Sequence, residues 1–196
     1  MTRLLLIRHA HHDYIGRAIA GWLPGVALSL QGQAQAAALP GRLAGAGITA
    51  IYSSPLERAL ETARPVAENL GLSIEIRESL GEVRFGAFTG RTMAGLESDP
   101  AWQRFRDYRS GTRAPGGELM VESQVRMVAE LERIRERHPG GVAAVFSHSD
   151  IIRAAIVHYA GMPLDLFERI EISPASVSVV ELSEEGPRIL ALNATA

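Results

Sequence analysis

Near its start the chain reads Leu4-Leu5-Leu6-Ile7-Arg8-His9-Ala10-His11-His12. Its four apolar residues are too few for a helix and suit a strand buried on both faces, and charged and imidazole side chains follow at once. In open α/β sheets, ligands bind beyond the carboxyl ends of the strands. The stretch therefore predicts a buried strand over 4–7 whose end opens into a polar site.

Two later segments repeat the order of strand, polar turn and helix. The β-prone run 48–52 leads into Ser53-Ser54-Pro55, which we interpret as a serine-capped helix start whose capping box is closed by Glu57. The apolar run 142–146 leads into Ser147-His148-Ser149 and another helix. In a parallel sheet, the ends of these strands lie along one edge.

The remaining segments predict the other elements. Helices are expected over 30–43, 55–70, 100–109, 118–137 and 151–159, and further strands over 74–76, 167–172, 176–182 and 188–192. The residues expected to form the buried face of the helix over 118–137 are Val121, Val125, Val128, Leu131 and Ile134. Strand and helix alternation followed by hairpins predicts a three-layer α/β/α fold with a mainly parallel central sheet and an antiparallel C-terminal addition.

Length and composition narrow the class of protein. We expect a single domain over 1–196, because 46% hydrophobic and 21% charged residues are typical of one globular unit of this length. A formal net charge of −2 argues against nonspecific nucleic-acid binding, and the absence of cysteine excludes disulfides and thiolate chemistry. The N-terminal apolar run is too short for a signal peptide or a membrane span, so we expect a cytoplasmic protein with no membrane partner.

The predicted sheet edge brings together Arg8, His9, Arg58 and His148, although they are far apart in the chain. Guanidinium and imidazole groups around one point suit a dianionic, tetrahedral group such as phosphate, and the helix starts at Pro55 and Ser149 would add backbone N–H donors. A neutral imidazole could attack phosphorus in line and form a phosphohistidine. A nearby carboxylic acid would protonate the leaving alkoxide and then activate water.

These residues resemble the motifs of the histidine phosphatase superfamily, which includes the cofactor-dependent phosphoglycerate mutases. The similar segments, in the family's order, are Arg8-His9-Ala10, Leu28 through Ala36, Ser53 through Ala59 with Thr62-Ala63, Glu82 through Gly86, Pro115 through Glu118, and Ser147-His148 with Ile152-Arg153. The resemblance covers nearly the whole chain. Its first loop looks most like a branch whose members are named as phosphatases or phosphomutases.

The resemblance implies a phosphoglycerate mutase-like fold and a phosphomonoester hydrolase without a cofactor. It implies His9 as nucleophile and Glu82 as general acid and base. The residues that we expect to bind phosphate or the rest of the substrate are Arg8, Arg58, His148, Ser149 and Arg17. The expected partner is a small phosphorylated metabolite, and the oligomeric state is open, a homodimer being one option.

Three positions depart from the family pattern. Ala10 stands where glycine is usual, so we expect its methyl group to approach the phosphate pocket. Ser149 replaces a glycine, and Ile15 aligns with the family's asparagine, whose phosphate contact would be missing or supplied differently. These departures make a non-catalytic phospho-ligand binder one alternative.

Two other functions stay open. A phosphomutase of the same superfamily is one, although a compact chain leaves little room for the insertions that such mutases use. A metallohydrolase is the other, because the stretch from His9 through Asp13 resembles a His-x-His-x-Asp-His zinc cluster. Arginines in the segments that should frame the leaving group either bind a second negative charge or form a solvated basic face. They are Arg17, Arg91, Arg104, Arg106, Arg109 and Arg113.

Overall fold

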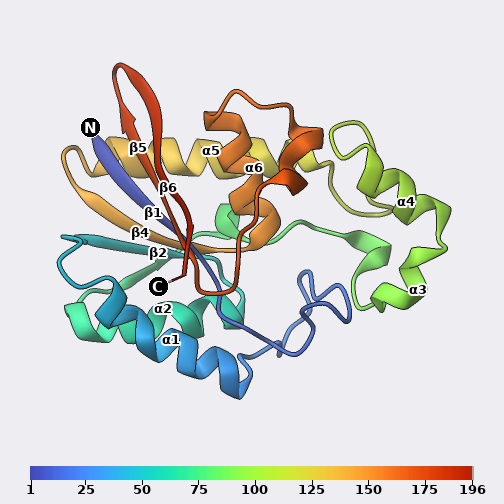
Figure 1. Ribbon diagram of the computed structural model, residues 1–196, viewed down its shortest axis with the longest axis horizontal. Helices are drawn as coiled ribbons and strands as arrows, with labels where there is room; N and C mark the ends of the chain where they lie inside the picture. The colour runs from blue at the N-terminus through green and yellow to red at the C-terminus, as the bar shows by residue number, and fades with distance from the viewer. Residues whose placement is uncertain (196) are drawn as a thin grey trace.

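A six-stranded sheet with the order β3-β2-β4-β1-β5-β6 forms the middle layer of the computed structural model, which describes residues 1–195 (Figure 1). Its strands are β1 (Thr2–Arg8), β2 (Ala50–Ser53), β3 (Ile74–Ile76), β4 (Val142–Ser147), β5 (Val177–Ser183) and β6 (Gly186–Ala194). The neighbours from β3 to β1 pair in parallel, whereas β5 and β6 pair antiparallel. The predicted fold class, including the antiparallel C-terminal addition, is confirmed.

Helices cover both faces of this sheet (Figure 1). One face carries α1 (Leu30–Arg42) and α2 (Glu57–Leu70), and the other carries α5 (Met120–Arg137) and α6 (Ser149–Tyr159). The short helices α3 (Met93–Glu97) and α4 (Pro100–Asp107) extend beyond the sheet, and the 3₁₀ helices are η1 (Glu78–Leu80), η2 (Gly86–Phe88) and η3 (Leu164–Arg169). Among residues 1–195, none of the helices combines the length and apolar character needed to cross a bilayer.

The apolar run of β1 divides its side chains between two cores. Leu4 and Leu6 belong to the core beneath α5 and α6, whereas Leu5 and Ile7 belong to the core beneath α1 and α2. Because successive side chains of a strand point to opposite faces, a strand covered on both faces needs a continuous apolar run. Packing on both faces therefore fixes the position of β1, the strand that leads directly into His9.

The prediction of a strand over 167–172 is wrong. Residues Leu164–Arg169 form η3, in which Leu164 and Phe167 are buried. Asp165 accepts hydrogen bonds from the backbone N–H and the hydroxyl of Ser110, at 2.8 and 2.7 Å. These tertiary contacts stabilise a turn that the β-prone composition did not reveal.

The buried face expected for the helix over 118–137 is wrong at its first two positions. The helix begins at Met120, and Met120, Met127, Leu131 and Ile134 face the core, whereas Val121 and Val125 are exposed. Val121 and Val125 lie one turn apart and form a second apolar stripe beside the buried one. Helical periodicity does not show which of two apolar stripes faces the core, and the prediction chose the exposed one at this end of the helix.

The capping box expected at the start of α2 is also wrong. The helix begins at Glu57 with Leu56 at the N-cap and no side-chain cap. Ser54 Oγ lies 2.7 Å from His148 Nε2, and Glu57 Oε1 accepts a hydrogen bond from the backbone N–H of Gly25 at 2.9 Å. Ser54 Oγ also accepts a hydrogen bond from the Leu56 N–H at 3.3 Å, so the serine contacts the start of the helix, whereas Glu57 binds the loop at Gly25 and closes no capping box.

Candidate active site

The carboxyl ends of three parallel strands meet at one edge of the sheet. Arg8 at the end of β1 is the register partner of Ser147 in β4, and Phe146 in β4 is the partner of Ser53 in β2. His9 and His148 come directly after β1 and β4, and Arg58 lies in the first turn of α2 after β2. The predicted convergence of these side chains is therefore present.

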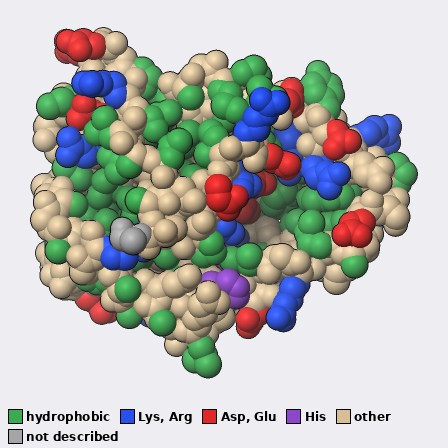
Figure 2. All heavy atoms as spheres, viewed as in Figure 1, with side chains coloured by type: hydrophobic (Ala, Val, Ile, Leu, Met, Phe, Trp, Pro, Cys, Tyr) green, Lys and Arg blue, Asp and Glu red, His purple; other side chains and the backbone are tan. Residues whose placement is uncertain are grey.

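A cavity of about 480 Å³ opens at this edge. Its lining residues are Arg8, His9, His12, Ile15, Gly16, Ala18, Ile19, Ala20, Gly21, Arg58, Glu82, Phe85, Met93, Ser149, Asp150 and Arg153. On the face shown in Figure 2, acidic, basic and hydrophobic side chains border a hollow near the centre, and a histidine lies below it. The cavity thus combines a charged end with an apolar wall.

The hydrogen bond of the His9 ring fixes its tautomer. Nδ1 lies 2.8 Å from the carbonyl oxygen of Ala10, which can only accept, so Nδ1 carries the proton of the neutral ring. Burial, followed by the charges of Arg58 and Arg8, holds the pKa of His9 well below its usual range. The ring is therefore neutral at pH 7 and its Nε2 keeps a free lone pair.

Two arginines bring positive charge to the same end of the cavity. Arg58 is buried and donates from Nη2 to the carbonyl oxygen of Gly21 at 2.9 Å, while its Nε and Nη1 find no partner within residues 1–195. Arg8 donates from Nη1 to the carbonyl oxygen of Ile172 at 2.6 Å, and its buried Nε is likewise unpaired there. Unpaired buried N–H groups are costly, and an anion with several acceptor oxygens would satisfy them.

His148 lies behind the lining of the cavity. It is fully buried, its ring centroid is 5.1 Å from that of His9, and its Nδ1 is 4.0 Å from Glu82 Oε2. Burial and the charge of Arg58 hold the pKa of His148 well below its usual range, so this ring is also neutral at pH 7.

Glu82 supplies the carboxyl group of the site. Its Oε1 accepts a hydrogen bond from the backbone N–H of Val83 at 2.9 Å. Burial and the nearby charge of Asp150 raise the pKa of Glu82 to about 7, against the opposing effect of Arg58 and Arg8. A carboxyl group with this pKa can give and take a proton near neutral pH.

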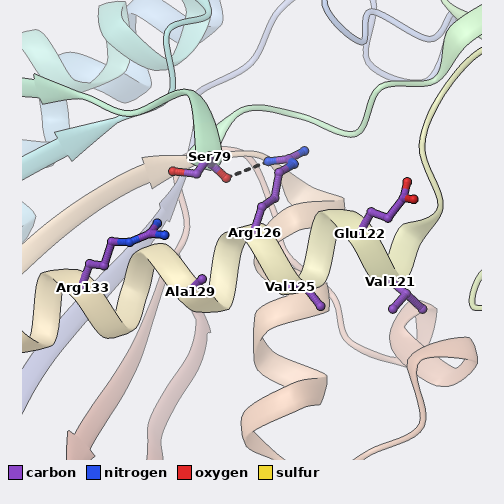
Figure 3. Close-up of a pocket in the computed structure, with 7 residues that line it drawn as sticks. All are labelled: Ser79, Val121, Glu122, Val125, Arg126, Ala129 and Arg133. Atoms are coloured by element: carbon purple, nitrogen blue, oxygen red, sulfur yellow. Dashed lines mark hydrogen bonds between the residues drawn. The ribbon is translucent and has the colours of Figure 1, made fainter.

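An arginine of α5 holds the backbone at Glu82 and just before it. Arg126 Nη1 donates to the carbonyl oxygens of Ser79 and Gly81, both at 2.7 Å, and Nη2 donates to that of Glu82 at 2.8 Å. Figure 3 shows this side chain reaching from α5 to Ser79. Glu118, which ends the segment that resembles a family motif, pairs with Arg126 at 2.8 Å and accepts a hydrogen bond from the Arg84 N–H.

Replacing Arg126 by methionine removes these three backbone contacts. We expect kcat for an alkyl phosphomonoester to fall about 10- to 100-fold, because a small displacement of a catalytic group is enough for such a loss. The loss should be smaller for p-nitrophenyl phosphate, whose leaving group needs little help from an acid. Arg133→Met is the matched control, since Arg133 lies on the same helix with a side chain 64% exposed. Equal losses for both substrates would contradict a role in positioning Glu82.

The structure does not bring every predicted residue to the cavity. Ser149 lines it, whereas Arg17 is exposed and is not among the lining residues. Ala10 was expected to direct its methyl group at the phosphate pocket, and this is wrong. It is fully buried in the core beneath α1 and α2, where its N–H donates to Thr62 Oγ1 at 2.9 Å. That contact holds Ala10 on the α2 side of the sheet.

His12 and Asp150 also line the cavity, although neither is among the site residues expected from the sequence. His12 accepts the backbone N–H of Tyr14 at Nδ1 (3.2 Å), so Nε2 carries the proton of its neutral ring. Burial and the charges of Arg58 and Arg8 lower the pKa of His12 to about 3. Asp150 follows Ser149 at the start of α6. Its place in the polar turn after β4 is the only feature of the sequence that points to a position at the site.

The zinc alternative finds no ligand set in the described part of the chain. Within residues 1–195, no three His, Asp or Glu side chains are grouped so that they could hold a metal ion. The ring of His11 is hydrogen-bonded through Nδ1 to Ser29 Oγ at 2.8 Å and does not line the cavity.

Comparisons with known proteins agree with this fold. The model of the histidine phosphatase superfamily (branch 1) matches residues 4–195. Phosphoserine phosphatase 1 of Hydrogenobacter thermophilus is 31% identical over 204 residues, which cover 100% of this chain and 93% of that protein. Among solved structures, Bacillus stearothermophilus YhfR has a TM-score of 0.93 at 26% identity, covering 100% of this chain and 98% of that one. Mycobacterial glucosyl-3-phosphoglycerate phosphatase has a TM-score of 0.88 at 25% identity, covering 99% of each chain.

The sheet topology and the paired histidines define a protein of the phosphoglycerate mutase-like class. Within that class, the chain belongs to branch 1 of the histidine phosphatase superfamily. The family resemblance seen in the sequence is confirmed.

Proposed function

We propose that this protein hydrolyses small phosphomonoesters through a phosphohistidine formed on His9. One observation carries the proposal. The hydrogen bond from His9 Nδ1 to the Ala10 carbonyl leaves Nε2 unprotonated, at a cavity that also holds two guanidinium groups and a carboxyl group. A neutral imidazole with a free lone pair beside a bound phosphate is a nucleophile for phosphorus.

In the first step, the lone pair of Nε2 forms a bond to phosphorus while the bond from phosphorus to the alcohol oxygen breaks. Arg8 and Arg58 stabilise the charge on the equatorial phosphate oxygens, and the proton on His12 Nε2 is available to one of them. Protonated Glu82 gives its proton to the leaving alkoxide. The product alcohol then departs and leaves the phosphohistidine.

In the second step, water takes the place of the alcohol. Glu82, now a carboxylate, accepts a proton from this water as its oxygen attacks phosphorus and the N–P bond breaks. Inorganic phosphate leaves, His9 returns to its neutral form, and Glu82 is protonated again. His148 lies behind the cavity with its Nδ1 4.0 Å from Glu82 Oε2, and we assign it the role of positioning this carboxylate.

Trapping the intermediate tests the proposal. Brief reaction with a ³²P-labelled phosphomonoester followed by alkaline quenching should leave label on His9 that is stable in base and lost in acid. Peptide mapping locates the label. Label on another residue, or hydrolysis without any labelled protein in rapid-quench experiments, would overturn the proposed intermediate.

Transfer to water distinguishes a phosphatase from a mutase of the same family. We expect inorganic phosphate to account for the phosphate lost from the substrate, even when a second alcohol is added as acceptor. Phosphoryl transfer to that alcohol in preference to water would favour the mutase. Measuring both products in one reaction by ³¹P NMR decides between them.

The pKa of Glu82 sets the expected pH dependence. Because burial and Asp150 raise this pKa to about 7, the carboxyl group is protonated below that pH and ionised above it. We therefore expect kcat/KM for an alkyl phosphomonoester to fall as the pH rises through about 7. The lowered pKa of His9 keeps the nucleophile neutral through the ordinary histidine range. With p-nitrophenyl phosphate the fall should be weak, and identical profiles for both esters would argue against Glu82 as the acid.

A further inference from the structure

We infer that the preferred substrates are phosphomonoesters whose alcohol part is uncharged and apolar on one side. The inference rests on the proposed function, because it assumes that the phosphate lies at the end of the cavity formed by Arg8 and Arg58. The alcohol part then lies against the rest of the lining. That remaining part of the cavity has two properties that bear on the substrate: an apolar wall and a balanced charge.

The apolar wall consists of Ile15, Ile19, Phe85 and Met93. Ile15 and Ile19 belong to the loop after β1, Phe85 follows the segment that holds Glu82, and Met93 begins α3. Backbone hydrogen bonds join the loop to the segment before α3, from Ile19 N–H to the Arg91 carbonyl at 3.0 Å and from Gly90 N–H to the Ile19 carbonyl at 2.7 Å. These backbone hydrogen bonds hold the side chains of the wall in one continuous surface.

The charges beyond the phosphate end compensate one another. Asp150 and Arg153 line the cavity and pair at 3.5 Å. Arg153 also donates from Nε to the Ile170 carbonyl at 2.7 Å and pairs with Glu171 at 3.5 Å. Arg153 is thus paired with two carboxylates, and Asp150 also lies 3.7 Å from Arg109, so a further anion would have to compete with carboxylates already in place.

None of the arginines that the sequence offered for a second negative charge lines the cavity within residues 1–195. Arg91 pairs with Asp99 at 2.5 Å, Arg113 pairs with Glu122 at 2.5 Å, and Arg109 pairs with Glu168 at 3.1 Å. These arginines therefore do not form a site for a second negative charge in this cavity. A carboxylate on the substrate would lose water against an apolar wall without gaining a counterion, which is costly.

A matched pair of substrates tests this. Glycerol 3-phosphate and 3-phosphoglycerate differ in that a neutral hydroxymethyl group replaces a carboxylate. We expect kcat/KM for glycerol 3-phosphate to exceed that for 3-phosphoglycerate by at least about tenfold, and 2-phenylethyl phosphate to be better still because it also covers the wall. Equal or faster hydrolysis of 3-phosphoglycerate would overturn the inference.

A cation placed in the wall should reverse part of this preference. In Ile19→Arg, and separately in Met93→Arg, we expect the ratio of the two kcat/KM values to move toward 3-phosphoglycerate by about tenfold. Leu190→Arg adds the same charge on β6, where Leu190 is 45% exposed and away from the cavity, and should leave the ratio unchanged. Thermal unfolding confirms that the variants are folded. An unchanged ratio in both folded wall variants would contradict the assignment of the wall.

Binding separates a failure of this inference from a failure of the proposed function. In His9→Ala, isothermal titration calorimetry measures the affinity for both phosphates without turnover, and the same preference for glycerol 3-phosphate is expected. Hydrolysis that depends on His9 but prefers 3-phosphoglycerate would leave the function standing and overturn the substrate class. Preferential binding of the neutral ester without any hydrolysis by the wild type would overturn the proposed function and leave the binding preference standing.

Discussion

His9→Ala is expected to lower kcat for phosphomonoester hydrolysis by at least about 10⁴-fold, the scale seen when a covalent nucleophile is removed. The substitution takes away the only protein atom proposed to bond to phosphorus. It leaves Arg8 and Arg58 in place, so inhibition by inorganic phosphate should change only a few-fold. The measurement is steady-state phosphate release by both proteins.

His11→Ala is the matched control for this experiment. His11 lies two residues further along the chain, but its ring bonds to Ser29 and does not line the cavity. We expect its loss to change kcat only a few-fold. Wild-type rates in His9→Ala, or comparable losses in the two variants, would contradict a covalent role for His9.

The second large effect is expected for Glu82→Gln. Glutamine keeps the shape of the side chain but cannot give or take the proton. We expect kcat for an alkyl phosphomonoester to fall about 10²- to 10⁴-fold. With p-nitrophenyl phosphate the first step should remain fast and only the hydrolysis of the phosphohistidine should slow. The expected signature is a burst of p-nitrophenol equal to the amount of enzyme, followed by slow turnover.

Glu78→Gln is the control for this second variant. Glu78 lies in η1, close to Glu82 in the chain, but its side chain is 72% exposed and pairs with Arg84. Rates within a few-fold of the wild type are expected. If Glu82→Gln slowed the release of p-nitrophenol in the first turnover as strongly as it slowed alkyl ester cleavage, Glu82 would not be the acid.

The parts of the site that follow directly from buried strands could be predicted from the sequence. The runs 4–7 and 142–146 are apolar at every position, which predicts strands buried on both faces. His9 and His148, which follow these strands, could therefore be assigned to the same edge of the sheet. Arg58 could be assigned because it lies off the apolar stripe of its helix. In each case a local pattern contains the information.

Other features depend on contacts between distant segments. The ring of His12 enters the cavity because of a turn in the loop after β1, and η3 forms where the hairpin composition suggested a strand. The apolar wall joins residues of that loop to Phe85 and Met93, which no periodicity connects. The exposure of Val125 was missed because both stripes of its helix are apolar, and only the packing partner decides between them.

The pairing of β1 on both sides has a consequence for where the molecule can open. β1 lies between β4 and β5, and its amides are protected by partners on both edges, so hydrogen exchange there requires disruption of the sheet itself. The loop that follows, with Ile15 and Ile19, lies outside the sheet and is held by its own turns and by backbone hydrogen bonds to residues 90–93, where Ala18 and Thr92 form a bridge. Such a segment can open and exchange independently of the sheet. Mutations in the loop can therefore alter the alcohol-binding wall while the strand that carries His9 stays protected.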